Sequence, residues 1–240
     1  MRLIWDELGK ALPMIFHGNP QLLDVIWFTV QVAVVATAAA TLIGLPIGLA
    51  LALGRFRGRN LLRALANASL ALPPVLVGVF LFILFSPAAP LGFLHLIWTR
   101  RVVFIAQTIL ALPFVVALSA AAIQALAPGL LAQARLLGAG RLQVSMLALR
   151  EARIGVIAAL IAALGTSLAE VAAVALLGGN IYGYDQTLAS ATLYEVGGGY
   201  YADAVAIGIV LIVLILILMC GLGVLQQQGN GIRMRFRSAA

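Results

Sequence analysis

The residues that could do chemistry lie in two places. The segment 127–153 carries four arginines and three glycines between two long apolar runs, and Glu170 is the one acidic residue inside such a run. A short basic helix bounded by glycines can offer a rigid surface to a partner. A carboxylate within a membrane span faces the protein interior or a water-filled path, because exposure to lipid is costly. We therefore take segment 127–153 as the candidate docking loop and Glu170 as the candidate path residue.

Several catalytic devices are absent from the sequence. A phosphate-binding P-loop needs a lysine after its last glycine, yet the only lysine is Lys10, which Ala11 follows. His17 and His95 are far apart, with no cysteine or carboxylate at the spacing of a zinc site. No grouping of serine, histidine and aspartate is evident either. We expect no catalytic residue, no metal and no cofactor, and hence a protein that is not an enzyme.

The composition places the chain in a membrane. Hydrophobic residues make up 63% of the 240, the mean hydropathy is +1.11, and 10% of the residues are charged. A helix that crosses a bilayer needs about 20 mostly apolar residues. The runs that qualify are 24–53, 65–85, 102–126, 155–177 and 204–225. We predict an all-α, polytopic protein with about five transmembrane helices: an outer interfacial segment 1–23, a transmembrane domain 24–225, and a basic tail 226–240.

Basic residues set the predicted orientation, because arginine and lysine accumulate in short cytoplasmic loops. Three clusters share one side of a five-span protein: Arg55, Arg57, Arg59 and Arg63; Arg135, Arg141, Arg150 and Arg153; Arg233, Arg235 and Arg237. The N-terminus should therefore be outside and the C-terminus in the cytoplasm. The net charge of +7 follows this topology, so the bilayer and not a nucleic acid is the expected partner.

Segment 127–153 predicts two helices. Pro128 suits a first helical turn, residues 130–137 are good helix formers, and Gly138 supplies a left-handed cap. After Gly140, residues 141–153 should form a second helix that runs into the fourth span. The apolar face of the first helix (Leu130, Leu131, Ala134 and Leu137) needs either a partner groove or the inner leaflet, with the arginines on anionic lipid. The spacing alone leaves both open.

The loop also resembles a known motif. The stretch Ala132-Gln133-Ala134-Arg135-Leu136-Leu137-Gly138-Ala139-Gly140 is similar to the cytoplasmic "EAA" loop of permease subunits of binding-protein-dependent ABC importers. Ala134 and Gly138 stand at the third and seventh positions of that pattern. Ala132 and Gln133 replace its leading Glu-Ala, and Leu149-Arg150-Glu151 falls where the pattern has x-Leu-Pro.

Three further motifs resemble the permeases of tungstate importers, relatives of the molybdate and sulfate permeases. They are Leu72-Pro73-Pro74-Val75-Leu76-Val77-Gly78, Ala106-Gln107-Thr108-Ile109-Leu110-Ala111-Leu112-Pro113, and Leu168-Ala169-Glu170-Val171-Ala172-Ala173-Val174 with Gly178-Gly179-Asn180-Ile181. The resemblance implies a type I ABC importer permease fold in the inner membrane and a homodimer with two cytoplasmic ATPase subunits, which bind the ATP. It also implies an extracytoplasmic oxyanion-binding protein. The substrate is expected to be tungstate, with molybdate and sulfate as alternatives.

The site residues expected from this assignment form two groups. The ATPase-docking loop comprises Leu131, Ala134, Arg135, Leu137, Gly138 and Arg141. The translocation path or gate comprises Pro73, Pro74, Gln107, Pro113, Thr166, Ser167 and Glu170, where the prolines are expected to kink their spans.

Glu170 has three possible roles: a hydrogen-bonding post at the dimer seam, a gate element, or a proton carrier. The last belongs to the alternative function, a proton-coupled secondary transporter. A single intramembrane carboxylate and the absence of an internal repeat count against that alternative. The outer loop 178–203, rich in glycine and tyrosine, is either a docking surface, a re-entrant piece or a flexible loop without function.

Overall fold

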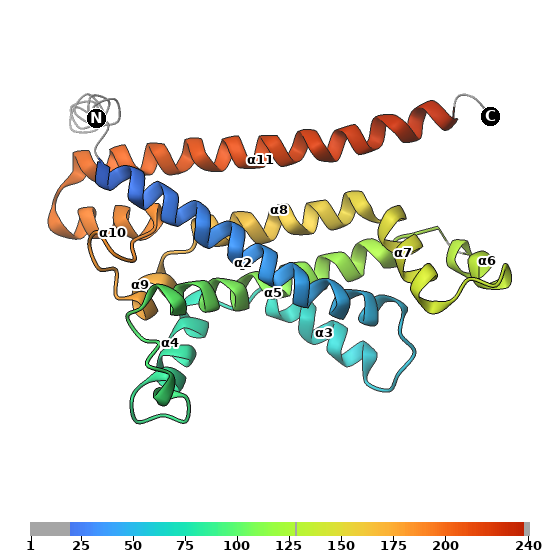
Figure 1. The fold of residues 1–240 in the computed structure, drawn as a ribbon, viewed down its shortest axis with the longest axis horizontal. Helices are drawn as coiled ribbons and strands as arrows, with labels where there is room; N and C mark the ends of the chain where they lie inside the picture. The colour runs from blue at the N-terminus through green and yellow to red at the C-terminus, as the bar shows by residue number, and fades with distance from the viewer. Residues whose placement is uncertain (1–19, 128, 238–240) are drawn as a thin grey trace. The chain divides into compact units, whose positions relative to one another are not determined.

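The computed structural model describes residues 20–127 and 129–237, and their regular elements are all helical (Figure 1). In chain order these are α2 (Pro20–Leu53), α3 (Arg59–Ser69), α4 (Pro74–Phe85), the 3-10 turn η1 (Gly92–Leu94), α5 (Arg100–Gln124), α6 (Leu130–Leu136), α7 (Arg141–Glu151), α8 (Arg153–Ala169), α9 (Ala172–Gly178), α10 (Leu188–Gly198) and α11 (Tyr201–Arg237). Residues 1–19 of the predicted interfacial segment, and Pro128, lie outside the described residues.

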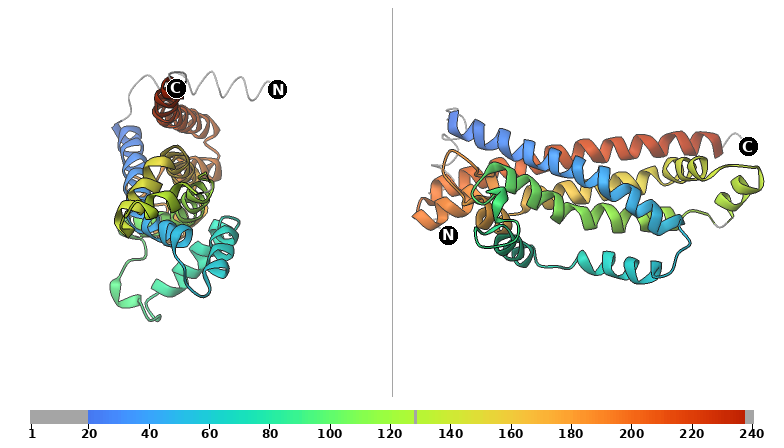
Figure 2. Two further views of the ribbon diagram at one scale, coloured as in Figure 1. Left: turned by 90° about the vertical axis from the view of Figure 1, so that its right-hand side faces the viewer. Right: turned by 60° about the horizontal axis from the view of Figure 1, so that its bottom comes forward.

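Three of the predicted spans are single helices. Gln21–Leu53 within α2, Arg100–Gln124, which is α5, and Tyr201–Val224 within α11 are each long and apolar enough to cross a membrane. Figure 2 shows α11 as one uninterrupted helix. Two further candidates are helix pairs that are sharply bent at a short break, α3 with α4 and α7 with α8. Counting each pair as one span gives the predicted five.

The second predicted span, 65–85, is not one helix. Helix α3 ends at Ser69, and α4 begins afresh at Pro74 with Pro73 in an extended conformation as its N-cap. A proline fits the first turn of a helix because the backbone N–H that it lacks has no helical acceptor there. The expectation that Pro73 and Pro74 kink a continuous helix was therefore wrong, since they start a new one.

The fourth predicted span, 155–177, is also interrupted. Helix α8 ends at Ala169 and α9 begins at Ala172, so Glu170 and Val171 lie between them. The second helix of the docking loop was expected to run into this span, but it does not. Helix α7 ends at Glu151, and α8 starts at Arg153 with a bend of 71°.

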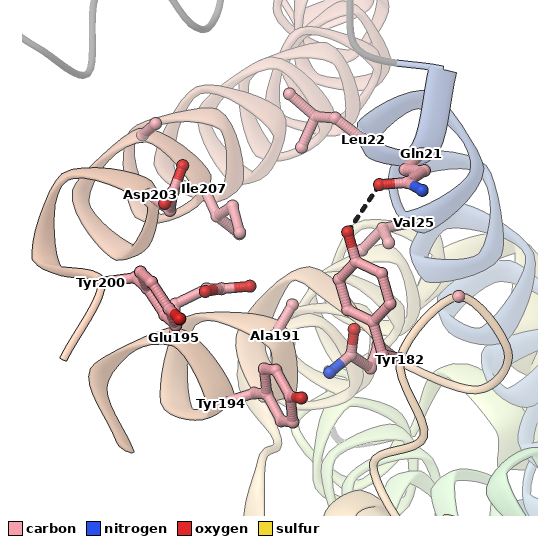
Figure 3. A pocket seen from close by; sticks show the side chains of 13 residues that line it. Gln21, Leu22, Val25, Tyr182, Ala191, Tyr194, Glu195, Tyr200, Asp203 and Ile207 are labelled. Carbon is pink, nitrogen blue, oxygen red and sulfur yellow. Dashed lines mark hydrogen bonds between the residues drawn. The ribbon is translucent and has the colours of Figure 1, made fainter. Parts of the chain in front are cut away.

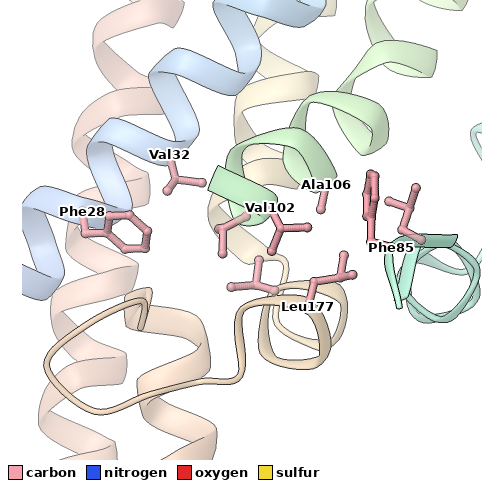
Figure 4. Packing of buried hydrophobic residues seen from close by; sticks show 9 residues of the cluster. Phe28, Val32, Phe85, Val102, Ala106 and Leu177 are labelled. Carbon is pink, nitrogen blue, oxygen red and sulfur yellow. The ribbon is translucent and has the colours of Figure 1, made fainter. Parts of the chain in front are cut away.

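The chain forms two compact units, each with its own core. Unit 1 comprises the described residues up to Thr37, Leu72–Leu110 and Leu164–Leu218. Its core draws on α2, α4, α5 and α9, whose side chains point toward one another in Figure 4. Phe28, Val32, Val102 and Leu177 there are each at most 3% exposed. Bringing α9 into this core also positions the break that contains Glu170.

Unit 2 comprises Ala38–Ala71, Ala111–Ala163 and the described residues from Met219 onward. The α2 and α5 segments approach closely there, at Gly44 and Gly48 of α2. A Cβ atom at Gly44 would lie 3.0 Å from Val115 Cγ1, and one at Gly48 would lie 2.2 Å from Ser119 Oγ. Small residues one turn apart allow backbones to approach in this way.

Two arginines cap the C-terminal end of α2 within unit 2. Arg59 donates from Nε to the Leu51 carbonyl (2.8 Å), from Nη1 to Gly54 (2.7 Å) and from Nη2 to Ala52 (3.1 Å). Arg63 donates to the carbonyls of Leu51 (2.8 Å) and Ala52 (3.3 Å). The last carbonyls of a helix find no N–H donor within the helix, so positively charged side chains stabilise that end. These arginines therefore fix the α2–α3 turn, a role that counting charges could not reveal.

Candidate docking loop and translocation path

Glycines define both ends of α6, the first helix of the docking loop. Gly129 precedes it with φ +92°, and Gly138 follows it with φ +88°. The N–H of Gly138 donates to Arg135 O and the N–H of Ala139 donates to Ala134 O, both at 3.0 Å. This pair of bonds is a Schellman motif, which a glycine at its left-handed position permits. The predicted cap at Gly138 is confirmed.

The second helix, α7, has a buried and an exposed face. Val144 and Ala148, one turn apart, are at most 2% exposed, and Ala148 belongs to the core of unit 2. Leu142 and Met146, also one turn apart, are 74% and 52% exposed. In the first turn of this helix, Gln143 Oε1 accepts a hydrogen bond of 2.8 Å from the N–H of Gly140, the residue just before the helix.

An apolar surface results at the junction of the two helices. Leu136 and Leu137 are 87% and 89% exposed, the highest values among the described large apolar side chains. With Leu142 and Met146 they form what we call the α6–α7 patch, and the exposed side chains of Arg135 and Arg141 flank it in sequence. Figure 1 shows α6 beside α7. Exposed apolar patches of this kind mark sites of interaction.

The structure divides the apolar face that the sequence suggested for α6. Leu131 packs against the core of unit 2, and Ala134 is half-buried. Leu131 therefore faces its own chain, whereas Leu137 faces outward. Sequence reasoning missed Leu136, Leu142 and Met146, although the spacing of Leu142 and Met146 opposite Val144 and Ala148 would have shown a second apolar stripe.

Comparison with known proteins identifies this architecture. The family described as "Binding-protein-dependent transport system inner membrane component" matches residues 44–228. The chain belongs to this family. It is thus an ABC importer permease, a multi-pass inner membrane protein of a transport complex.

Individual relatives agree with the family. A probable anion ABC transporter permease protein of Haloferax volcanii is 32% identical over 192 residues, which cover 78% of this chain and 83% of the relative. The tungstate uptake system permease protein TupB of Peptoclostridium acidaminophilum is 28% identical over 208 residues, covering 87% and 91%. A chain of the MetNI methionine ABC transporter, solved in inward-facing conformations, matches this permease with a TM-score of 0.67 at 21% identity. The match covers 92% of this permease and 96% of the MetNI chain. That likeness shows the type I importer permease fold.

Two of the predicted path residues of the permease are buried polar groups in unit 1 that have no hydrogen-bond partner among the described residues. Gln107 in α5 is 0% exposed, and neither its amide nitrogen nor its amide oxygen has a hydrogen-bond partner among the described residues. Ser167 in α8 is 4% exposed, and its hydroxyl likewise has none. Buried polar groups left without partners are uncommon and call for an explanation such as water or a ligand. Pro113 lies inside α5, in the part of that helix that belongs to unit 2.

Glu170 has a defined structural contact in the permease. Its side chain is 8% exposed, and Oε1 accepts a hydrogen bond of 2.9 Å from the Ala173 N–H, in the first turn of α9. A carboxylate at this place satisfies a donor that the helix itself leaves unpaired, and it lies at the positive end of the peptide dipoles. This is the contact that a hydrogen-bonding post requires.

The outer loop contains a second buried carboxylate. Asp185 is 0% exposed, its Oδ1 accepts from the Ile181 N–H, and its Oδ2 lies against Gly178 without a partner among the described residues. Burial raises the pKa of Asp185, although the backbone N–H groups of Ile181 and Asp185 and the charge of Arg100 act in the opposite direction. Among the residues that the structure describes, no group of three or more His, Cys, Asp or Glu side chains could hold a metal ion.

Proposed function

We propose that the permease forms, as a homodimer, the translocation path for a tetrahedral oxyanion. Tungstate is the first candidate, and molybdate and sulfate are the others. The relatives named for anion and tungstate uptake support this class of substrate. Two copies of a separate ATPase provide the energy, and an extracytoplasmic binding protein delivers the anion.

The α6–α7 patch is the observation that carries the proposal. An apolar surface that is more than half exposed at all four side chains, on a helix closed by a Schellman motif, is suited to a groove on a soluble partner. Leu136 and Leu137 enter that groove, Arg135 and Arg141 lie at its rim, and Ala134 and Gly138 set the shape of the helix. Leu131 anchors α6 to its own unit.

The homodimer is supported by α11. The most apolar part of this helix has a mean hydropathy of 3.3 and is 6% buried within the chain, whereas the corresponding part of α5 is 56% buried. Such a helix needs lipid or a second copy around it.

The orientation with the N-terminus outside places the α6–α7 patch in the cytoplasm, because the arginines of the loop share that side with those of the α2–α3 turn.

Docking is tested by Leu137→Asp in the full-length permease, co-expressed with the ATPase from the same cell. Because Leu137 is 89% exposed, the variant should insert and fold, yet the amount of co-purified ATPase should fall at least tenfold. Phe56→Asp is the matched control, since Phe56 is also an exposed apolar residue of unit 2, in the turn after α2. Equal ATPase recovery with both variants would refute docking at the patch.

Transport is tested in vesicles that contain permease, ATPase and binding protein. Uptake of tungstate should require ATP and should be insensitive to collapse of the proton gradient. Glu170→Gln should keep a substantial fraction of uptake, because an amide oxygen can still accept from Ala173 N–H, whereas Glu170→Leu removes the acceptor. Uptake that follows the proton gradient without ATP and is abolished in Glu170→Gln would instead establish the proton-coupled transporter.

A further inference from the structure

A cavity of about 400 Å³ lies in unit 1, where the start of α2 meets α10, the start of α11 and the loop before α10 (Figure 3). We call it the tyrosine cavity. Three tyrosines, Tyr182, Tyr194 and Tyr200, and two carboxylates, Glu195 and Asp203, line it. The ring centroids of Tyr182 and Tyr194 are 6.1 Å apart. The Tyr182 hydroxyl donates a hydrogen bond to the side-chain oxygen of Gln21 in α2.

The charge of the tyrosine cavity defines what it can hold. Among the described residues that line it, two are carboxylates and none is basic, so an oxyanion would be repelled. A calcium ion needs six to eight oxygen ligands, of which two carboxylates supply at most four. An ammonium group, in contrast, can pair with both carboxylates and lie over the face of a tyrosine ring.

Glu195 lies where a cation would be stabilising. Its side chain extends into the space between α10 and α11 in Figure 3. Burial raises the pKa of Glu195, and the nearby charge of Asp203 raises it further. A cation between the two carboxylates would offset both effects.

We propose that the tyrosine cavity binds the ammonium group of Lys10, from the segment that precedes α2. The first turn of α2 forms one wall of the cavity through Gln21, Leu22 and Val25. Lys10 lies eleven positions before Gln21, and eleven residues span about 36 Å when extended. Lys10 can therefore reach the carboxylates without leaving its own chain.

The tether and the charges favour this occupant over a partner protein. A cation on a short linker has an effective concentration in the millimolar range near its site. Residues 1–19 contain one lysine and one arginine, and Arg2 is eight positions farther from α2 than Lys10. Asp6 and Glu7 would be repelled by Glu195 and Asp203, so the part of the segment around Lys10 is the part that fits. The contact would tie the segment before α2 to α10 and α11, and it does not depend on which substrate the permease carries.

The test uses the fact that Lys10 is the only lysine of the chain. A carbodiimide joins an amine directly to a neighbouring carboxylate, with loss of water and without a spacer. Treatment of the purified full-length permease should join the Lys10 peptide to the peptide of Glu195 or Asp203 within one chain, as detected by mass spectrometry. In Glu195→Gln/Asp203→Asn the yield of these cross-links should fall at least tenfold. Lys10→Arg should abolish them, because a guanidinium does not couple, while it keeps the charge.

A second measurement keeps the proposal testable if coupling is inefficient. Lys10→Glu should lower the thermal midpoint of the permease in detergent, Lys10→Arg should not, and Lys10→Glu/Glu195→Lys should restore it. Three results would overturn the proposal: coupling of Lys10 mainly to the exposed Asp24, coupling between two copies of the chain, or equal midpoints for Lys10→Glu and Lys10→Arg. Coupling between copies would assign the cavity to Lys10 of a second copy.

Discussion

Gly48 offers the sharpest test of how α2 and α5 pack in unit 2. A Cβ atom at this position would lie 2.2 Å from Ser119 Oγ and 3.1 Å from the Val116 carbonyl oxygen. The first distance requires the Ser119 hydroxyl to move. Ser119 is 0% exposed, so its hydroxyl has little room to move. Its hydrogen bond to Val116 O is long, at 3.4 Å, and the movement would break it.

The size of the effect follows from a comparison with Gly208. Both glycines are inside helices, so replacement by alanine gains about 0.5–1 kcal/mol of helix stability in each case. A Cβ at Gly208 meets nothing within 4 Å, whereas one at Gly48 overpacks the contact with α5. Overpacking a well-packed site costs about 1–3 kcal/mol. Gly48→Ala should therefore be less stable than Gly208→Ala by this amount, or about 2–12 °C in thermal midpoint for a chain of this length.

The assay is thermal unfolding of each permease variant in the same detergent, followed by size-exclusion chromatography. Gly48→Ala/Ser119→Ala should recover at least half of the loss, because the nearest obstructing atom is gone while the Val116 oxygen remains. Coupling between contacting residues is commonly about 0.5–3 kcal/mol. Equal midpoints for Gly48→Ala and Gly208→Ala, or no recovery in the double variant, would show that the helices do not approach as described.

Two further predictions concern charged groups. Arg59→Lys should lower the thermal midpoint by the equivalent of about 1–3 kcal/mol, because an ammonium cannot reproduce the guanidinium fork that bonds two carbonyls of α2 and that of Gly54 just after it. Arg55→Lys, at an exposed position, should have no effect. Because the pKa of Asp185 is raised in the folded state, its contribution to stability is present at low pH and is lost as the pH rises through that raised pKa. Asp185→Asn should therefore gain stability relative to the unmodified permease as the pH rises, and a difference in midpoint that stays constant from pH 4 to pH 8 would contradict this.

The sequence predicted the helices that composition alone specifies. The runs that became α2, α5 and α11 are apolar over more than 20 residues, and nothing but a helix satisfies the backbone of such a run in lipid. The cap at Gly138 could also be predicted from the sequence, because a glycine after a short helical run commonly takes the left-handed position. These inferences needed only local information.

The break between α8 and α9 could not be predicted in that way. Residues 168–174 contain no glycine and no proline, and each would be accepted in a continuous helix. The break depends on tertiary packing: Val174 and Leu177 of α9 are buried in the core of unit 1 with Phe28 and Val102. The roles of Arg59 and Arg63 were missed for a related reason, because these residues meet carbonyls 5 to 12 positions away only after the chain has turned.

Glu170 shows why the broken helix matters for mechanism. A proton carrier must gain and lose its charge in every cycle, and each protonation would weaken the hydrogen bond that Glu170 accepts from the first turn of α9. The side chain is 8% exposed and bound to Ala173 N–H, so the strength of this contact at the start of α9 would change with every proton that passed. A neutral amide can make the same bond without this cost, and an importer driven by ATP has no need for the charge to change. The geometry thus favours a permanent structural contact, which is why Glu170→Gln separates the ATP-driven importer from the proton-coupled transporter more cleanly than removal of the side chain would.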